Sequence, residues 1–101
     1  MRFTIRIIPA AARDAEAAAQ WYDRERTGLG RRFLAEVKRV SKRIREAPLQ
    51  LPLVDEGVRR ALLRTFPYAM FFSIDANVIV VVAIVHLHRR PDSWRERAGA
   101  S

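Results

Sequence analysis

The sequence contains no cysteine and no long hydrophobic run, and it has fewer acidic than basic residues. Without cysteine the chain can form neither a disulfide framework nor a thiolate metal site, which fits a reducing cytoplasm. The longest apolar run, Val78–Val85, has eight residues, whereas a membrane-spanning helix needs about 20. The amino terminus has arginine inside its apolar stretch and no small-residue cleavage site, unlike a signal peptide. We expect a cytoplasmic protein without a membrane partner.

Three signatures of common enzyme classes are also missing. The chain has no serine nucleophile elbow, no P-loop and no paired carboxylates, which leaves few enzymatic interpretations. His86 and His88 have no third ligand at a suitable spacing, and Arg89 and Arg90 beside them would repel a cation. We therefore expect no metal and no other cofactor.

Positive charge is the clearest feature of the composition. The chain carries 19 basic residues against 11 acidic ones, a formal net charge of +8 over 101 residues. Such an excess favours acidic partners: nucleic acid, an anionic membrane surface or an acidic protein segment. Seventeen of the basic residues are arginine, which suits phosphate and carboxylate recognition. A genome that encodes arginine in preference to lysine would give the same count.

Apolar residues at helical spacing predict two helices, from Ala10 to about Glu25 and across Phe33 to before Pro48. The two stripes share the spacing i, i+4, i+7, i+11 and consist of Ala11, Ala15, Ala18 and Tyr22 and of Phe33, Val37, Val40 and Ile44. The short break at residues 27–30 predicts an antiparallel helical hairpin.

Four strands are expected around this hairpin. They are the alternating segment that ends at Pro9 and the runs 58–64, 69–74 and 78–86, whereas residues 48–57, with two prolines and a glycine, are typical of a loop. We predict an α+β domain of order β-α-α-β-β-β, with the helical hairpin packed on a mainly antiparallel four-stranded sheet.

The chain length allows one domain, which we place at residues 1–97 with a frayed tail at 98–101. Whether the polar segment 92–101 is ordered stays open, since Trp94, its only large apolar residue, can fold back onto the sheet.

A first group of basic residues falls on the second helix, opposite its apolar stripe. They are Arg31, Arg32, Lys38, Arg39, Lys42, Arg43 and Arg45. No aromatic side chain stands among them to stack on bases. We interpret this group as the solvated face of an amphipathic helix.

A second basic group, Arg59, Arg60 and Arg64, lies on the predicted strand 58–64. In a strand Arg60 and Arg64 share one face, where they form a cationic platform for phosphates or carboxylates. The same charges can also protect an edge strand from pairing with another sheet.

The third group follows the longest apolar strand and consists of His86, His88, Arg89 and Arg90. Two imidazoles beside two guanidiniums can transfer protons near an anion. The simpler interpretation is that a histidine satisfies the end of the strand.

A series of short motifs runs along most of the chain. They are residues 11–14 (AARD), Trp21-Tyr22, residues 30–33 (GRRF), Pro48, residues 58–63 (VRRALL), 66–68 (FPY) and 86–91 (HLHRRP), and Trp94-Arg95. In this order and at this length, the motifs resemble the RelE/ParE superfamily of type II toxin–antitoxin toxins. The resemblance covers about residues 3–97.

The resemblance implies a small bacterial toxin that a cognate antitoxin neutralises in a hetero-oligomer. ParE-like members of the superfamily poison DNA gyrase, whereas RelE-like members enter the ribosome and cleave mRNA. The FPY motif and the spacing of His86 and Arg89 are nearer to the ParE-like, plasmid-stabilisation branch. We therefore expect growth inhibition through DNA gyrase.

The alternative is a RelE-like ribosome-dependent endoribonuclease, for which the resemblance implies His86, Arg60, Arg64 and Arg89 as catalytic candidates. Against it, the chain has no tyrosine after Tyr68 and no lysine on the predicted sheet, which the best-known nuclease members use. A third possibility is that the toxin activity has decayed and only antitoxin binding remains.

Residues for binding the target or the antitoxin are expected on the strands and strand ends under all three hypotheses. They are Arg59, Arg60, Arg64, His88, Arg89, Arg90 and Trp94.

Overall fold

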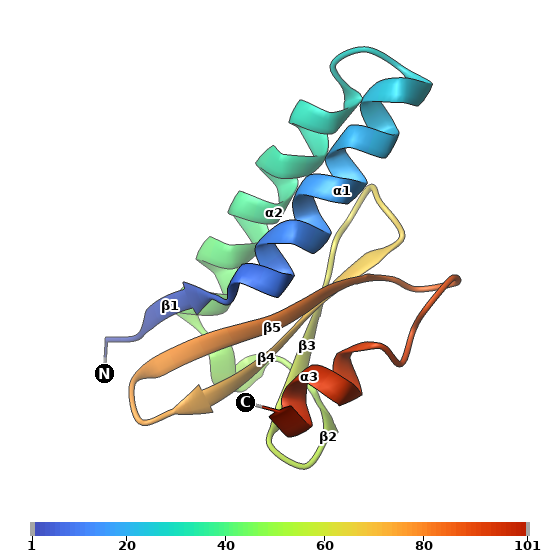
Figure 1. Cartoon of the computed structure of the whole chain (residues 1–101). Coiled ribbons are helices and arrows are strands. Elements are labelled where there is room, and N and C mark those ends of the chain that lie inside the picture. Colours follow the sequence, from blue (N-terminus) through green and yellow to red (C-terminus); the bar gives the residue numbers. More distant parts are fainter. Residues whose placement is uncertain (1, 101) are drawn as a thin grey trace.

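The computed structural model describes residues 2–100, which form a five-stranded sheet with helices on both faces (Figure 1). The elements are β1 (Thr4–Ile7), α1 (Pro9–Glu25), α2 (Leu29–Glu46), a 3-10 turn (Pro48–Gln50), β2 (Leu53–Asp55), β3 (Val58–Leu62), β4 (Tyr68–Asp75), β5 (Val78–His86) and α3 (Trp94–Ala100). The predicted α+β class is confirmed, and the predicted elements occur in the predicted order, with β2 and α3 in addition. Within residues 2–100, no helix has the length and apolar character needed to cross a bilayer.

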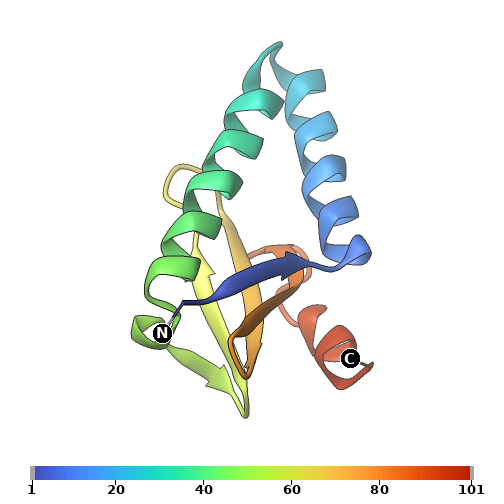
Figure 2. The same cartoon turned by 90° about the vertical axis from the view of Figure 1, so that its left-hand side faces the viewer.

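The helical hairpin forms as the two apolar stripes predict, because both are buried in one core with the sheet. Alanine on α1 leaves room for the larger side chains of α2, such as Phe33 and Ile44, which are completely buried. Figures 1 and 2 show that the far end of the hairpin projects beyond the sheet.

The turn of the hairpin depends on two glycines. Gly28 has a φ of 91°, a left-handed conformation that glycine adopts without strain. A Cβ on Gly30 would lie 2.3 Å from the carbonyl oxygen of Ala19, so the backbones of α1 and α2 touch there. Asp23 accepts hydrogen bonds from the N–H groups of Gly28 (3.2 Å) and Gly30 (2.8 Å). Its carboxylate thereby satisfies donors that the start of a helix leaves free.

The sheet has the strand order β1-β5-β4-β3-β2. Strand β1 is parallel to β5, and the other pairs are antiparallel. The predicted count of four strands was wrong, because the expected loop 48–57 contains β2. This strand has only three residues and follows Pro52, and Val54 is its only half-buried residue. The alternation of apolar and polar residues is therefore too short to be recognised in the sequence.

A buried carboxylate ends β3 earlier than predicted. Glu36 of α2 accepts hydrogen bonds from the N–H groups of Arg64 (2.5 Å) and Thr65 (3.0 Å) and from the Thr65 hydroxyl. Burial opposes ionisation of Glu36, but these hydrogen bonds together lower its pKa. They also turn the chain away from β4, so the expected strand 58–64 ends at Leu62, and Arg64 does not continue the face of Arg60.

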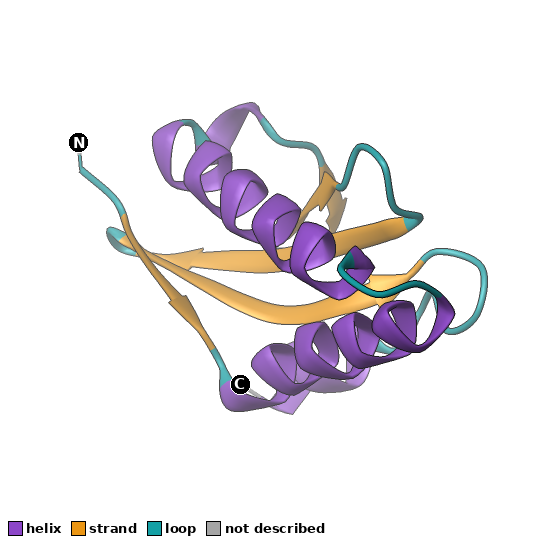
Figure 3. Ribbon diagram, turned by 90° about the horizontal axis from the view of Figure 1, so that it is seen from above, coloured by secondary structure: helices purple, strands orange, loops and turns teal. Residues whose placement is uncertain are grey.

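Helix α3 packs on the sheet face opposite the hairpin, because Trp94 and the hairpin belong to separate core clusters. Figure 3 shows β1, the strand that follows the N-terminus, leading into α1 at the edge of the sheet. Trp94 at its start is 4% exposed and stacks on Phe71, with 4.9 Å between ring centroids. The helix extends to Ala100, across part of the tail expected at 98–101. Ser101 lies outside the described residues, and the domain boundary at residue 97 stays a prediction.

We expect Gly30→Ala to lower the free energy of unfolding by about 2 kcal/mol, because the added methyl group overlaps the backbone of α1. Urea denaturation followed by circular dichroism measures this loss. The matched control is Gly57→Ala, where a Cβ meets no atom within 4 Å and only the φ of 72° opposes alanine, at a cost of about 1 kcal/mol. A loss at Gly30 no larger than that at Gly57 would contradict the close approach of the helices.

Candidate functional site

Strand β5 has a neighbour on its β1 side along its first half only. The N–H of Ile8, just after β1, donates to the carbonyl oxygen of Val81 (3.2 Å), and β1 pairs with no later residue of β5. At this point β5 contains a β-bulge, because Phe72 pairs with Val81 and Phe71 with Ala83, leaving Val82 as an extra residue. A bulge re-aims the groups that follow it. The second half of β5 therefore has backbone N–H and C=O groups on its β1 side that no strand pairs with.

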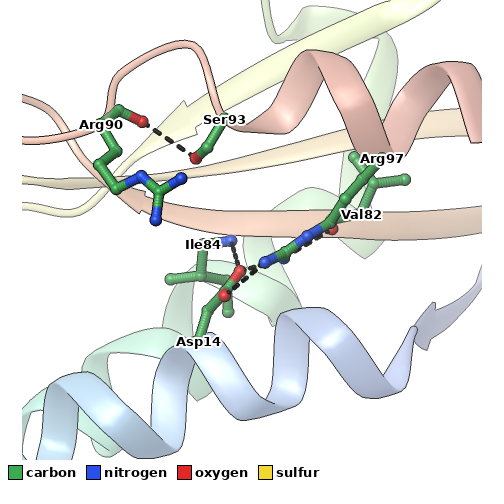
Figure 4. A network of polar contacts seen from close by, with 6 residues as sticks. All are labelled: Asp14, Val82, Ile84, Arg90, Ser93 and Arg97. Atoms are coloured by element: carbon green, nitrogen blue, oxygen red, sulfur yellow. Dashed lines mark hydrogen bonds and ion pairs between the residues drawn. The ribbon is translucent and has the colours of Figure 1, made fainter.

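An aspartate and an arginine form hydrogen bonds with the backbone groups on this side of β5 (Figure 4). Asp14 of α1 accepts a hydrogen bond from the N–H of Ile84 (3.0 Å). Arg97 of α3 donates to both carboxylate oxygens of Asp14, at 2.8 Å for one of them, and to the carbonyl oxygen of Val82 (3.3 Å). The hydrogen bond to Asp14 raises the pKa of Arg97 despite partial burial. The pair ties α1 and α3 to the end of β5.

A cleft of about 400 Å³ opens beside this pair. Its walls come from α1, the ends of β4 and β5, the turn after β5 and α3. The polar and aromatic lining residues are Asp14, Trp21, Arg24, Tyr68, His86, Arg89, Arg90, Ser93, Glu96 and Arg97. Four arginines against two carboxylates give the cleft an excess of positive charge, so its chemistry suits an anionic ligand.

His86 lies in the cleft as a neutral ring. Its imidazole packs edge-on against Tyr68, with 5.1 Å between centroids, and its Nδ1 accepts the N–H of His88 (3.0 Å). Desolvation, followed by the charges of Arg89 and His88, lowers the pKa of His86. The hydrogen bond assigns the remaining proton to Nε2. The ring can accept a proton at Nδ1 only by giving up this hydrogen bond to the N–H of His88.

Tyr68 is unsuited to proton abstraction. It belongs to an aromatic cluster with Tyr22, Phe33 and Phe66 beneath the hairpin. Burial raises the pKa of Tyr68, helped by Tyr22 and Asp14 and opposed by Arg89. Its hydroxyl therefore stays protonated at neutral pH.

The arginines of the cleft are held by different contacts. The guanidinium of Arg89 lies over the ring of Trp21, 4.8 Å from its centroid, a cation–π contact that fixes its position. The carbonyl oxygen of Arg90 accepts hydrogen bonds from the Ser93 hydroxyl (3.0 Å) and N–H (3.2 Å), which closes the turn toward α3. Of the predicted site residues, the structure brings together His86, Arg89 and Arg90, with His88 beside them.

The other predicted residues lie elsewhere. Arg59 donates to the carbonyl oxygens of Leu49 (3.3 Å) and Leu51 (2.6 Å), so it holds the segment before β2. Trp94 is buried beneath α3. Their binding roles stay predictions.

The nuclease candidates are divided between the two faces of the sheet. His86 pairs with Tyr68, whose side chain belongs to the core under the hairpin. Arg60 alternates with Ala61 of that same core, so it points to the α3 side. Its Nε is buried and has no hydrogen-bond partner among the described residues. Arg60 and Arg64 do not line the cleft that holds His86.

Sequence reasoning missed Asp14, Trp21 and Arg97 as parts of the site. One signal for Asp14 was available, because it lies three residues after Ala11 and four before Ala18, on the buried stripe of α1. A charge on an apolar stripe requires a partner. Arg97 has no comparable signal, since its contact spans 83 residues of sequence.

Comparison with solved structures identifies the same fold in toxins of toxin–antitoxin systems. The structure "Chromosomal ParDE TA system from P. aeruginosa" matches with a TM-score of 0.76 and 18% identity, over 84% of this chain and 96% of that chain. The toxin–antitoxin complex RelBE2 from Mycobacterium tuberculosis matches with a TM-score of 0.61 and 24% identity, over 85% and 99%. At these identities the likeness concerns the fold. No curated protein matches the sequence.

The sequence itself gives the family. Residues 5–91 match the family described as "ParE toxin of type II toxin-antitoxin system, parDE". The match covers most of the chain, including β5 and three of the four cleft arginines (Arg24, Arg89 and Arg90), and the chain belongs to this family. The predicted resemblance to the RelE/ParE superfamily is thereby confirmed.

We expect the imidazole of His86 to titrate below its ordinary pKa of 6.5. Because the folded state favours the neutral ring, this group stabilises the fold above pH 6.5 and loses that contribution as pH falls through its folded pKa. In Arg89→Gln the pKa should rise but stay below 6.5, since desolvation remains. Titration of the imidazole resonances by NMR measures both values, with Arg32→Gln as a distant control. An unchanged pKa in Arg89→Gln would contradict the placement of Arg89.

Proposed function

We propose that this ParE-family toxin acts in the cytoplasm by binding and inhibiting DNA gyrase, without catalysis of its own, and that a cognate antitoxin neutralises it in a hetero-oligomer. The observation that carries the proposal is the chemistry of the cleft. It gathers four arginines around a neutral histidine and a protonated tyrosine. The arginines can bind an anionic segment, and the one imidazole among them already accepts a hydrogen bond at Nδ1 from the N–H of His88.

The alternative is cleavage of mRNA on the ribosome. Cleavage by attack of a 2′-hydroxyl requires a proton acceptor beside cations that stabilise the phosphate. His86 is the one cleft imidazole, but its Nδ1 is occupied by the N–H of His88. Arg60 points to the other face of the sheet. Both features favour the binding function over the nuclease.

A toxin that poisons gyrase should damage DNA when it is expressed without antitoxin. We expect filamentous cells, trapped DNA cleavage complexes and an SOS response, because gyrase arrested on DNA leaves broken strands. Fluorescence from an SOS reporter and metabolic labelling of new protein distinguish the two candidate targets. Rapid arrest of translation with mRNA cut at translated codons, and without an SOS response, would establish the nuclease instead. Unaffected growth at normal expression would indicate a decayed toxin.

Variants of the cleft sharpen this test. The double variant Arg89→Glu/Arg90→Glu should lower toxicity at least about tenfold, since charge reversal opposes an anionic partner. His86→Gln, which removes any acid or base at this position, should retain toxicity. Arg32→Glu/Arg43→Glu, on the exposed side of α2, controls for the change in net charge. Loss of toxicity in His86→Gln with the fold intact would favour catalysis.

A further inference from the structure

Three arginines of the cleft have no carboxylate partner in the described part of the chain. Arg24 extends from α1, and Arg89 and Arg90 extend from the turn after β5. All three are exposed, and none of them takes part in an ion pair with another described residue. In Figure 4 the guanidinium of Arg90 lies apart from Asp14, whose oxygens Arg97 already holds. The cleft therefore has three cations available for a ligand.

Neutral donors lie beside these cations. The ring of His86 carries its proton on Nε2, since its Nδ1 accepts the N–H of His88. Tyr68 also lines the cleft, and its hydroxyl forms no hydrogen bond with another residue of the described chain. The donors thus come from α1, β4, β5 and the turn after β5, and they surround one hollow of about 400 Å³.

The aspartate in the same cleft shows what a carboxylate requires. Asp14 is bound by one arginine, Arg97, and by the N–H of Ile84, because one guanidinium fork matches two coplanar oxygens. Three further arginines with neutral donors beside them exceed the needs of one more carboxylate. A tetrahedral phosphate accepts hydrogen bonds from several directions, and arginine and tyrosine are among the side chains that bind the phosphates of nucleic acids.

The spacing of the arginines fits one strand of nucleic acid. The guanidinium of Arg89 lies over the ring of Trp21, 4.8 Å from its centroid. Arg24 follows three residues later on α1, about 4.5 Å further along the helix axis. One strand of DNA carries a phosphate about every 3.4 Å along its axis, so Arg24 and Arg89 can bind neighbouring phosphates. Trp21 also gives these cations the aromatic neighbour that the basic side of α2 lacks.

We propose that the cleft is a phosphate site that holds the backbone of a DNA strand through Arg24, Arg89 and Arg90, so that the toxin binds gyrase together with its DNA. This inference rests on the proposed function, because it takes gyrase to be the target. It assigns the anionic segment in the cleft to the DNA and not to the enzyme. Phosphate contacts fix position without reading sequence, so the site selects DNA that gyrase already holds and no particular base sequence.

Neutral linkages in the DNA test these contacts without any change in the protein. DNA gyrase is loaded with duplexes that carry an uncharged methylphosphonate at one linkage at a time. The affinity of the full chain for each complex is then measured by fluorescence anisotropy. We expect one or two neighbouring linkages at which affinity falls at least about fivefold, because each removes a charge-assisted contact with a guanidinium. Equal affinity at every linkage would overturn the proposal.

Variants of the arginines test the same contacts from the side of the protein. The affinity of the original chain for DNA-bound gyrase should fall steeply with salt, since each phosphate contact releases counterions. Arg24→Gln/Arg89→Gln should lower the slope of log affinity against log salt by about 2, one for each lost contact. The matched control, Arg32→Gln/Arg43→Gln, removes the same charge outside the cleft and should keep the slope within about 0.5 of the original.

All four of these side chains are exposed, so we expect both variants to fold, and circular dichroism checks this. An equal change of slope in the two variants would reveal a general charge effect and overturn the proposal.

The outcomes separate this proposal from the proposed function. At least about tenfold tighter binding to gyrase with DNA than without it supports the phosphate site. If the chain binds gyrase in neither form, the gyrase target itself fails. If it binds both forms equally tightly, gyrase remains the target and only the phosphate site is wrong, since an acidic segment of the enzyme then occupies the cleft. Tighter binding to a single-stranded RNA oligonucleotide than to the gyrase–DNA complex would also overturn the proposal.

Discussion

The ion pair between Asp14 and Arg97 is the interaction on which the candidate site depends. Strand β5 extends beyond the end of β1. The pair forms hydrogen bonds with the carbonyl oxygen of Val82 and the N–H of Ile84, which have no strand beside them. Its two members come from α1 and α3, which lie on opposite faces of the sheet. Removing either member would leave a partly buried charge without its partner, which is costly. The pair therefore fixes both helices around the end of β5 and gives the cleft its walls.

This constraint also determines the chemistry of the cleft. The bulge at Val82 places His86 on the hairpin side of the sheet, next to the buried Tyr68. Desolvation and the charges of Arg89 and His88 keep the imidazole neutral, and burial keeps the phenol protonated. The result is a cationic surface at the end of β5, with a neutral imidazole and a protonated phenol among its arginines.

The helical hairpin could be predicted because each of its apolar stripes, such as the one from Phe33 to Ile44, lies within a single helix and repeats at helical spacing. The three long strands after it could be predicted for the same reason. Strand β2 could not, because three residues after a proline carry too little pattern. The cleft could be predicted only in part. His86, Arg89 and Arg90 follow one strand, whereas the contact of Arg97 with Asp14 depends on a bulge and on tertiary folding.

The central claim, that the cleft makes this chain a gyrase-binding toxin and not a nuclease, is tested most directly with purified components. DNA gyrase, supercoiled plasmid and the chain are incubated, the protein is digested, and linear DNA is quantified. The account predicts linear DNA in proportion to the chain added, and little with a variant in which the cleft arginines are reversed in charge. No linear DNA, together with cut mRNA in a purified translation system, would contradict it.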